Sequence, residues 1–193
     1  MPLLWPLADR TDLRDRLVAA YSTARGYHDV RHLEEVLDRI VELGEADNLD
    51  VVLAAWYHDA VYDAAGDNEE RSAQRAESEL SGQTEVDVEE VARLVRLTTT
   101  HRPDQSDHNG CVLSDADLGI LAAPRERYDE YVADVRREYA AVPDRDFARG
   151  RLAVLEALNE KASLFHTELA RSLWEAAARA NLTREIDELR EHV

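Results

Sequence analysis

Residues that interrupt helices are scarce in this chain, and their scarcity constrains the fold more than any other feature. Only 7 glycines and 5 prolines occur among 193 residues, while alanine, leucine, glutamate and arginine, all good helix formers, dominate. Apolar residues recur at helical spacing along nearly the whole chain. The sequence therefore predicts an all-α fold, a compact helical bundle, rather than a sheet-rich one.

The periodicity and the capping residues place the individual helices. Asn48 is expected to cap one helix, and Asp67 with Glu70 and Asp87 with Glu90 have the spacing of capping boxes. Pro103 and the pair Asn109-Gly110 predict a loop over residues 102–114. Helices are expected over residues 13–21, 28–43, 49–58, 68–80, 88–98, 117–121, 124–141, 146–158 and 168–191.

Neither a repeat nor a convincing linker divides the sequence, so we expect one domain spanning residues 1–193. Apolar residues make up 45% of the chain, enough for a sizeable core. The single cysteine, Cys111, excludes an intrachain disulfide and fits a reducing compartment. The first residues lack a basic leader and a long apolar stretch, so neither a signal peptide nor a membrane span is expected. These features favour a cytoplasmic protein.

The formal net charge is −18. A field of that sign repels nucleic acid and anionic membranes, so neither is an expected partner. A small phosphate ester remains compatible with the charge, provided that a bound cation or a local group of arginines faces it. The acidic surface also has a simpler interpretation, which is solubility.

His28 and His32 are four residues apart, and we expect them to share a helix face that continues as Val36 and Ile40. That apolar continuation predicts that both side chains point inward. A buried imidazole needs a hydrogen bond, a carboxylate or a metal as its partner. Either residue could also be an ordinary core or capping histidine.

His58 and Asp59 end an otherwise apolar segment over residues 51–57. Such a pair requires compensation when its helix is packed on others. A helix continued beyond them would bring Asp63 to the same side, where it could hold a metal-bound water. The chain later places Asp117 within the apolar segment 113–121, where helix capping by Asp115 is the alternative explanation. A second His-Asp pair, formed by His28, shows that the dipeptide alone is not specific.

In their order and placement, His32, His58-Asp59 and Asp117 resemble the H…HD…D signature of the HD superfamily of metal-dependent phosphohydrolases. Four further strings, at residues 27–32, 55–63, 67–73 and 115–118, look like one subfamily of predicted bacterial HD hydrolases, and the similarity extends from about residue 20 to 185. The resemblance implies an all-helical, HD-type single domain with a signature region at about 20–125 and C-terminal helices, at about 125–193, packed on it. It also implies one divalent metal ion bound by His32, His58, Asp59 and Asp117.

The same resemblance implies hydrolysis of a phosphoester or pyrophosphate bond in a nucleotide or similar small phosphorylated metabolite. Two imidazoles and two carboxylates suit Mn, Fe, Co, Ni or Zn, and Mg is a further candidate. Asp63 and Glu69 are the candidate catalytic residues for orienting or deprotonating the attacking water. Related alarmone hydrolases have Glu-Asp after the His-Asp pair, whereas here Tyr62 replaces the glutamate, which weakens any transfer of their substrate.

His28, His101 and Arg102 are candidate substrate-binding residues. His101 falls where two-metal HD proteins have an additional histidine, and the other such position holds Asn68 or Glu69. Glu69 could supply an oxygen ligand in its place, or Asn68-Glu69-Glu70 could simply begin a capped helix. Alternatively, His101 and Arg102 could contact a substrate phosphate.

Three other interpretations of the chain stay open. An HD-type di-iron oxygenase would need two metals, and the missing histidine near Asn68 counts against it. A non-catalytic HD module could bind a metabolite without turnover. The histidines and aspartates could also form buried hydrogen-bonded pairs without metal. The sequence does not distinguish a monomer from a homo-oligomer.

Overall fold

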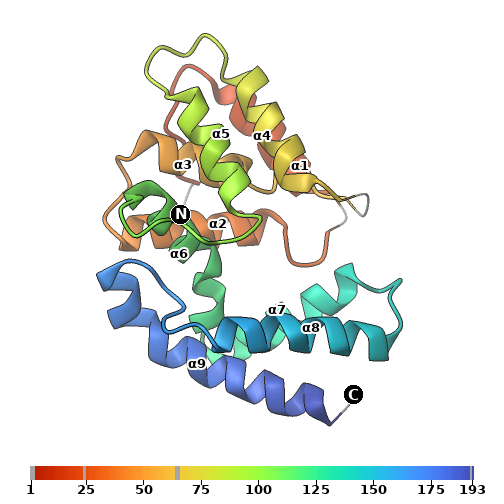
Figure 1. Ribbon diagram of the computed structural model, residues 1–193. Coiled ribbons are helices and arrows are strands. Elements are labelled where there is room, and N and C mark those ends of the chain that lie inside the picture. Colours follow the sequence, from red (N-terminus) through yellow and green to blue (C-terminus); the bar gives the residue numbers. More distant parts are fainter. Residues whose placement is uncertain (1–2, 24, 64–65, 192) are drawn as a thin grey trace. The chain divides into compact units, whose positions relative to one another are not determined.

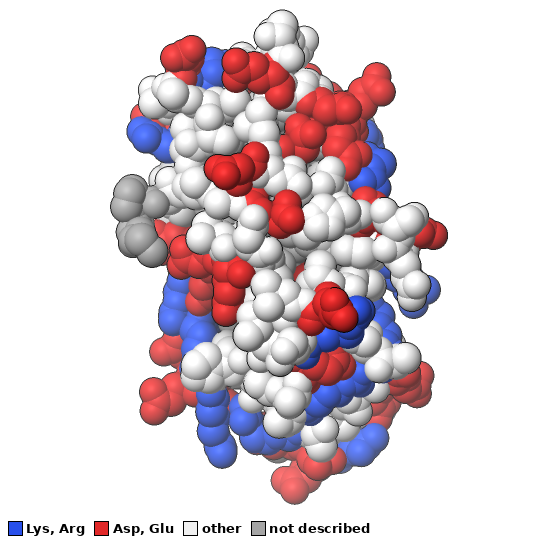
Figure 2. Space-filling view, turned by 90° about the vertical axis from the view of Figure 1, so that its left-hand side faces the viewer, with Lys and Arg blue, Asp and Glu red and all other residues white. Residues whose placement is uncertain are grey.

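The computed structural model describes residues 3–23, 25–63, 66–191 and 193 of the chain (Figure 1). Every regular element in these residues is a helix, so the all-α prediction is confirmed. The chain divides into two compact units, Met1–Asp117 and Leu118–Val193. None of the helices within the described ranges is long and apolar enough to cross a membrane. Acidic side chains are spread over the face drawn in Figure 2, in keeping with the net charge of −18.

The first unit is organised around a short helix, Leu49–Tyr57, that is buried over all but its first two residues. It contains α1 (Thr11–Tyr21), α2 (Val30–Glu42), α3 (Leu49–Tyr57), α4 (Asn68–Glu79), α5 (Val88–Leu97) and most of α6 (His108–Leu118). α3 packs against α2, α4 and α5, and every side chain from Val51 to Tyr57 is fully buried. A helix that is apolar all round is stable only when surrounded in this way. His58 and Asp59, which follow at the C-terminal end of α3, are buried as well.

The caps predicted at Asn48 and Asp87 form, whereas the cap of α4 is different. The side chain of Asn48 accepts a hydrogen bond from the N–H of Val51, and that of Asp87 accepts one from Glu90. The Asp87 N–H donates to Asp50 and not to Glu90, so the second bond of that capping box is absent. Asp67, in contrast, has a left-handed backbone with φ 62° and makes no side-chain cap. The side chain of Glu70 instead binds Arg96 on α5, so the capping box predicted from Asp67 and Glu70 does not form.

The prediction of a loop over 102–114 is wrong in its second half, because α6 begins at His108. Asp107 Oδ1 accepts a hydrogen bond from the N–H of Gly110 at 3.0 Å, and this bond satisfies a donor of the first helical turn. A Cβ at residue 110 would collide with the Asp107 carboxylate and lie 2.7 Å from Leu97 Cδ2. Gly110 thus permits close packing here and does not form the turn that an Asn-Gly pair predicts.

The second unit contains the 3₁₀ helix η1 (Gly119–Ala122), α7 (Arg125–Glu138), α8 (Asp144–Asn159) and α9 (Glu168–Arg190). α9 packs against α8 and η1, and the Asn181 side chain donates hydrogen bonds to the carbonyl oxygens of Leu121 and Ala123, both at 2.9 Å. Buried Glu185 accepts from Tyr128 on α7 and from Arg151 on α8. Because these partners come from three helices, they fix the helices relative to one another.

Candidate metal centre

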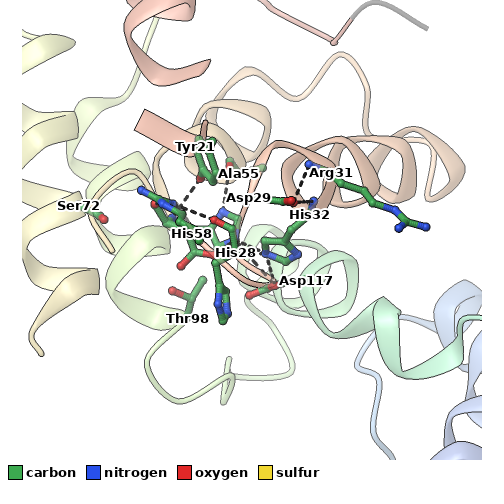
Figure 3. A network of polar contacts seen from close by, with 12 residues as sticks. Tyr21, His28, Asp29, Arg31, His32, Ala55, His58, Ser72, Thr98 and Asp117 are labelled. Carbon is green, nitrogen blue, oxygen red and sulfur yellow. Dashed lines mark hydrogen bonds and ion pairs between the residues drawn. The ribbon is translucent and has the colours of Figure 1, made fainter. Parts of the chain in front are cut away.

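The site forms where α2, α3 and α6 place histidine and aspartate side chains together (Figure 3). His32 lies in the first turn of α2, whose N-cap is Asp29. The Asp29 side chain accepts hydrogen bonds from the N–H groups of Arg31 and His32, at 2.9 and 3.2 Å. This cap starts α2 at Val30, so the prediction that His28 belongs to the helix is wrong. His28 nevertheless lies beside the site, with its ring 5.5 Å from that of His32.

His58 and Asp59 lie at the C-terminal end of α3, as the sequence predicted. His58 is the C-cap of the helix, and its Nδ1 lies 2.7 Å from the carbonyl oxygen of Ala55. Because a carbonyl oxygen only accepts, Nδ1 carries a proton and donates it. In the neutral imidazole, Nε2 is then left with a free lone pair. A hydrogen bond of this kind commonly orients a histidine that binds metal.

The ring nitrogens and carboxylate oxygens converge on one point. His32 Nε2 and His58 Nε2 are 3.0 Å apart. Asp59 Oδ2 lies 3.3 and 3.1 Å from these two nitrogens, and Asp117 Oδ1, from α6, lies 3.3 and 3.8 Å from them. His32, His58 and Asp59 are buried and form a group that could hold a metal ion, and the Asp117 side chain is only 15% exposed.

The donor set is compatible with a bound cation. His58 Nε2 and His32 Nε2 face each other at 3.0 Å, and if both nitrogens are unprotonated their lone pairs repel each other and the carboxylates. A proton on His32 Nε2, donated to His58, removes this repulsion, and so does a cation bound between the four side chains. Two imidazole nitrogens with carboxylate oxygens are ordinary ligands of divalent transition metals. The residues predicted to bind metal therefore fit such an ion.

The pKa values of the histidines and aspartates also indicate that positive charge is stabilised at this site. Burial alone would lower the pKa of His58, but the carboxylates of Asp59 and Asp117 outweigh it and raise that pKa to about 9. Burial opposes ionisation of the two aspartates, yet the neighbouring histidines hold the pKa of both carboxyls below the usual range. Each aspartate is thus an anion at neutral pH and is available as a ligand.

Two residues that were not predicted as site residues hold the backbone of Asp59. Buried Tyr21 accepts a hydrogen bond from the Asp59 N–H and donates one to the Trp56 carbonyl oxygen, both at 3.2 Å. Arg25 donates from Nη1 to the Asp59 carbonyl oxygen at 2.7 Å and to that of His28 at 2.9 Å. Contacts that span more than thirty residues of sequence leave no local signal, so periodicity and spacing could not reveal them.

The candidate catalytic residues lie outside this group of atoms. α3 ends at Tyr57, so the prediction that a continuous helix carries Asp63 to the same side as Asp59 is wrong. The Asp63 carboxylate pairs with Arg71 at 2.7 Å, and its side chain is 45% exposed. Glu69 lies half-buried in the first turn of α4. Their catalytic roles stay predictions.

Among the candidate substrate-binding residues, His28 and His101 lie against the site. The ring of His28 stacks on that of Tyr62, with centroids 4.3 Å apart. His101 Nε2 lies 3.4 Å from Asp117 Oδ2, the carboxylate oxygen opposite the one that faces His32 and His58. Arg102 follows His101 and is exposed. The three roles stay predictions, and for two of these residues the geometry gives a place beside the ligands.

Comparison with known proteins adds no identification: no family model, no curated protein and no solved structure matches the chain.

Proposed function

We propose that this chain is a metal-dependent hydrolase of phosphoester or pyrophosphate bonds in small phosphorylated metabolites. One observation carries the proposal: His32, His58 and Asp59 converge in a buried group with Asp117 beside them. Four such ligands would leave positions of a divalent ion open to water and substrate. The resemblance of these residues to the HD signature supports the choice of reaction.

The residues have distinct parts in this proposal. A bound divalent ion would lower the pKa of a water molecule and neutralise a phosphoryl oxygen. Ala55 keeps His58 in the tautomer that binds metal through Nε2, while Tyr21 and Arg25 fix the backbone of Asp59. Asp63 and Glu69 are candidates for orienting the attacking water or removing its proton, and replacing each in turn would distinguish them.

Metal content is the first test. Wild-type protein purified without chelators is expected to contain about one equivalent of a divalent transition metal, and His58→Ala is expected to lose it, as measured by elemental analysis. His108→Ala is the matched control, because His108 pairs with Glu45 on an exposed surface. Absence of metal after reconstitution with Mn, Fe, Co, Ni, Zn and Mg would contradict the proposal. Two equivalents of iron would favour the oxygenase alternative.

Phosphate release is the second test. The metal-loaded protein would be screened against phosphomonoesters, phosphodiesters and nucleoside polyphosphates, with Asp59→Ala beside it. Removal of a ligand carboxylate is expected to reduce the rate at least about 100-fold, the size of effect typical of an essential electrostatic group. Circular dichroism would establish that the variant stays folded. Undiminished release by the folded variant would refute the assignment of the site.

A further inference from the structure

Two arginines of the first unit differ from the others because they form no ion pair with a carboxylate among the described residues. Residues 1–117 contain eleven arginines and no lysine. Among the residues that the structure describes, nine of these arginines pair with a carboxylate: Arg10, Arg14, Arg16, Arg31, Arg39, Arg71, Arg75, Arg93 and Arg96. Arg25 and Arg102 form no such pair within the described ranges. In a chain with an excess of carboxylates, cations without a carboxylate partner are available to an anionic ligand.

Arg25 is fixed beside the metal ligands. Its guanidinium carbon lies 5.0 Å from the centroid of the Tyr21 ring and 5.6 Å from that of Tyr62. Nε donates to Thr23 and Nη1 donates to the carbonyl oxygens of His28 and Asp59. None of the hydrogen bonds described for Arg25 involves Nη2. The two N–H donors of Nη2 can therefore bind a ligand. The planar group is thus oriented before any ligand binds.

Arg102 lies in the segment between α5 and α6. It directly follows His101, whose Nε2 is 3.4 Å from Asp117 Oδ2. Its side chain is exposed, so an anion can reach it without rearrangement of the core. Arg25 is bonded to the residue that carries one ligand carboxylate, and Arg102 neighbours the residue that contacts another. Arg25 is therefore held beside the candidate metal ligands by hydrogen bonds, and Arg102 is linked to them through the backbone of His101.

We infer that Arg25 and Arg102 bind the anionic group of the substrate, an oxyanion of the phosphate class, at the metal centre. This inference rests on the proposed function and assigns that site its anion-binding residues. The carboxylates of Asp59 and Asp117 and the net charge of −18 would otherwise repel such a substrate. Arginine suits this task because its donors match the oxygens of a phosphate in pairs.

The test measures binding of inorganic phosphate, by calorimetry, to protein loaded with the ion found in the metal assay. Arg102→Glu and Arg25→Lys are expected to weaken phosphate binding about 10-fold or more, since each removes hydrogen bonds between a guanidinium and a charged ligand. Arg102→Glu is expected to keep the metal content of wild type, and the phosphate affinity of Arg25→Lys is compared at equal metal loading, because Arg25 also holds the Asp59 backbone. Arg25→Lys keeps the positive charge and a long side chain but loses the paired N–H donors of the guanidinium. A weaker affinity of this variant would therefore not result merely from deleting a packed side chain.

Arg14→Ala is the matched control, because Arg14 pairs with exposed Asp15 on α1, and it is expected to bind phosphate as wild type does. Phosphate affinities of both site variants within two-fold of wild type would overturn the inference, as would the absence of phosphate binding to metal-loaded wild type. Neither result would change the conclusion drawn from the metal content, which tests the proposed function separately. If instead no metal binds, the proposed function fails on its own test.

Discussion

Among the described residues other than glycine, only Asp67 and His101 have positive φ, 62° and 48°. This conformation costs an L-residue about 1–2 kcal/mol, and surrounding structure must offset it. For His101 the offset includes a contact of its ring with Asp117 Oδ2. A residue with a strained backbone whose side chain contacts the carboxylate of a candidate metal ligand is expected to serve the proposed site.

We predict that His101→Gly separates stability from metal binding. Glycine adopts positive φ without steric cost, so the free energy of unfolding of the metal-free protein should stay equal or rise by about 1 kcal/mol. The metal dissociation constant should rise about 10- to 100-fold, the effect usual for residues that orient a ligand. Urea unfolding and metal titration measure the two quantities.

Asp67→Gly provides the matched comparison, because it relieves the same backbone strain at the start of α4. It should change stability in the same direction and leave metal affinity at the wild-type value. Equal metal affinity in both variants would mean that the contact between His101 and Asp117 does not support the site.

At the scale of single residues, the sequence predicts which histidines and aspartates come together, but not the residues that hold them in place. His58-Asp59 stands out because a charged pair follows seven buried apolar residues. Tyr21 and Arg25 do not, since a tyrosine in an amphipathic helix and an arginine in a polar segment are both common. Their roles depend on contacts 38 and 34 residues away in the chain, which only the folded structure specifies.

At the scale of elements, α6 shows why turn signals mislead. Asn109-Gly110 resembles a turn when read locally, yet Asp107 caps the residues as a helix and Leu97 packs where a Cβ would lie. Intrinsic preference is a weak prior that packing overrides. α2 shows a smaller error of the same kind, because capping by Asp29 starts the helix at Val30. The burial of α3 was predictable because residues 51–57 are apolar on every side of the helix, so none of its faces suits contact with water.

Two substitutions of glycine by alanine should have opposite effects. Gly110→Ala places a Cβ against Asp107 and Leu97 and should lower the free energy of unfolding by about 1–3 kcal/mol. A Cβ added at Gly150, in α8, would meet nothing within 4 Å, so Gly150→Ala should raise it by up to about 1 kcal/mol. Urea unfolding of both variants measures the difference. A neutral effect at residue 110 would contradict the close packing of α5 and α6.

At the scale of the whole molecule, carboxylates dominate the response to pH. Hydrogen bonds from Arg96 lower the pKa of Glu70 to about 2 from its ordinary value of 4.5. The pKa values of Glu45, Glu90 and Glu175 are lowered as well. A group whose pKa is lower in the folded protein stabilises it above the unfolded value. That stability is lost as the pH falls through the folded value.

We therefore predict that the folded protein loses stability as pH falls from about 4.5 to about 2, the window between the unfolded and folded pKa values of Glu70. Midpoints of urea unfolding recorded at intervals of about half a pH unit measure this loss. Arg96→Gln should flatten the curve in that window, because it removes the main cause of the lowered pKa of Glu70. A curve that is level across the window would contradict the assignment of these ion pairs.

The peptide groups on both sides of Asp59 are tied to the first unit, the N–H by Tyr21 and the carbonyl by Arg25. Neither bond uses the carboxylate, so arrival or departure of an ion leaves the backbone of this residue in place. The Asp59 amide should accordingly exchange its hydrogen slowly with deuterium, at similar rates in chelated and metal-loaded protein. A scaffold that holds its shape when empty can release one ion and accept another without passing through a partly unfolded state.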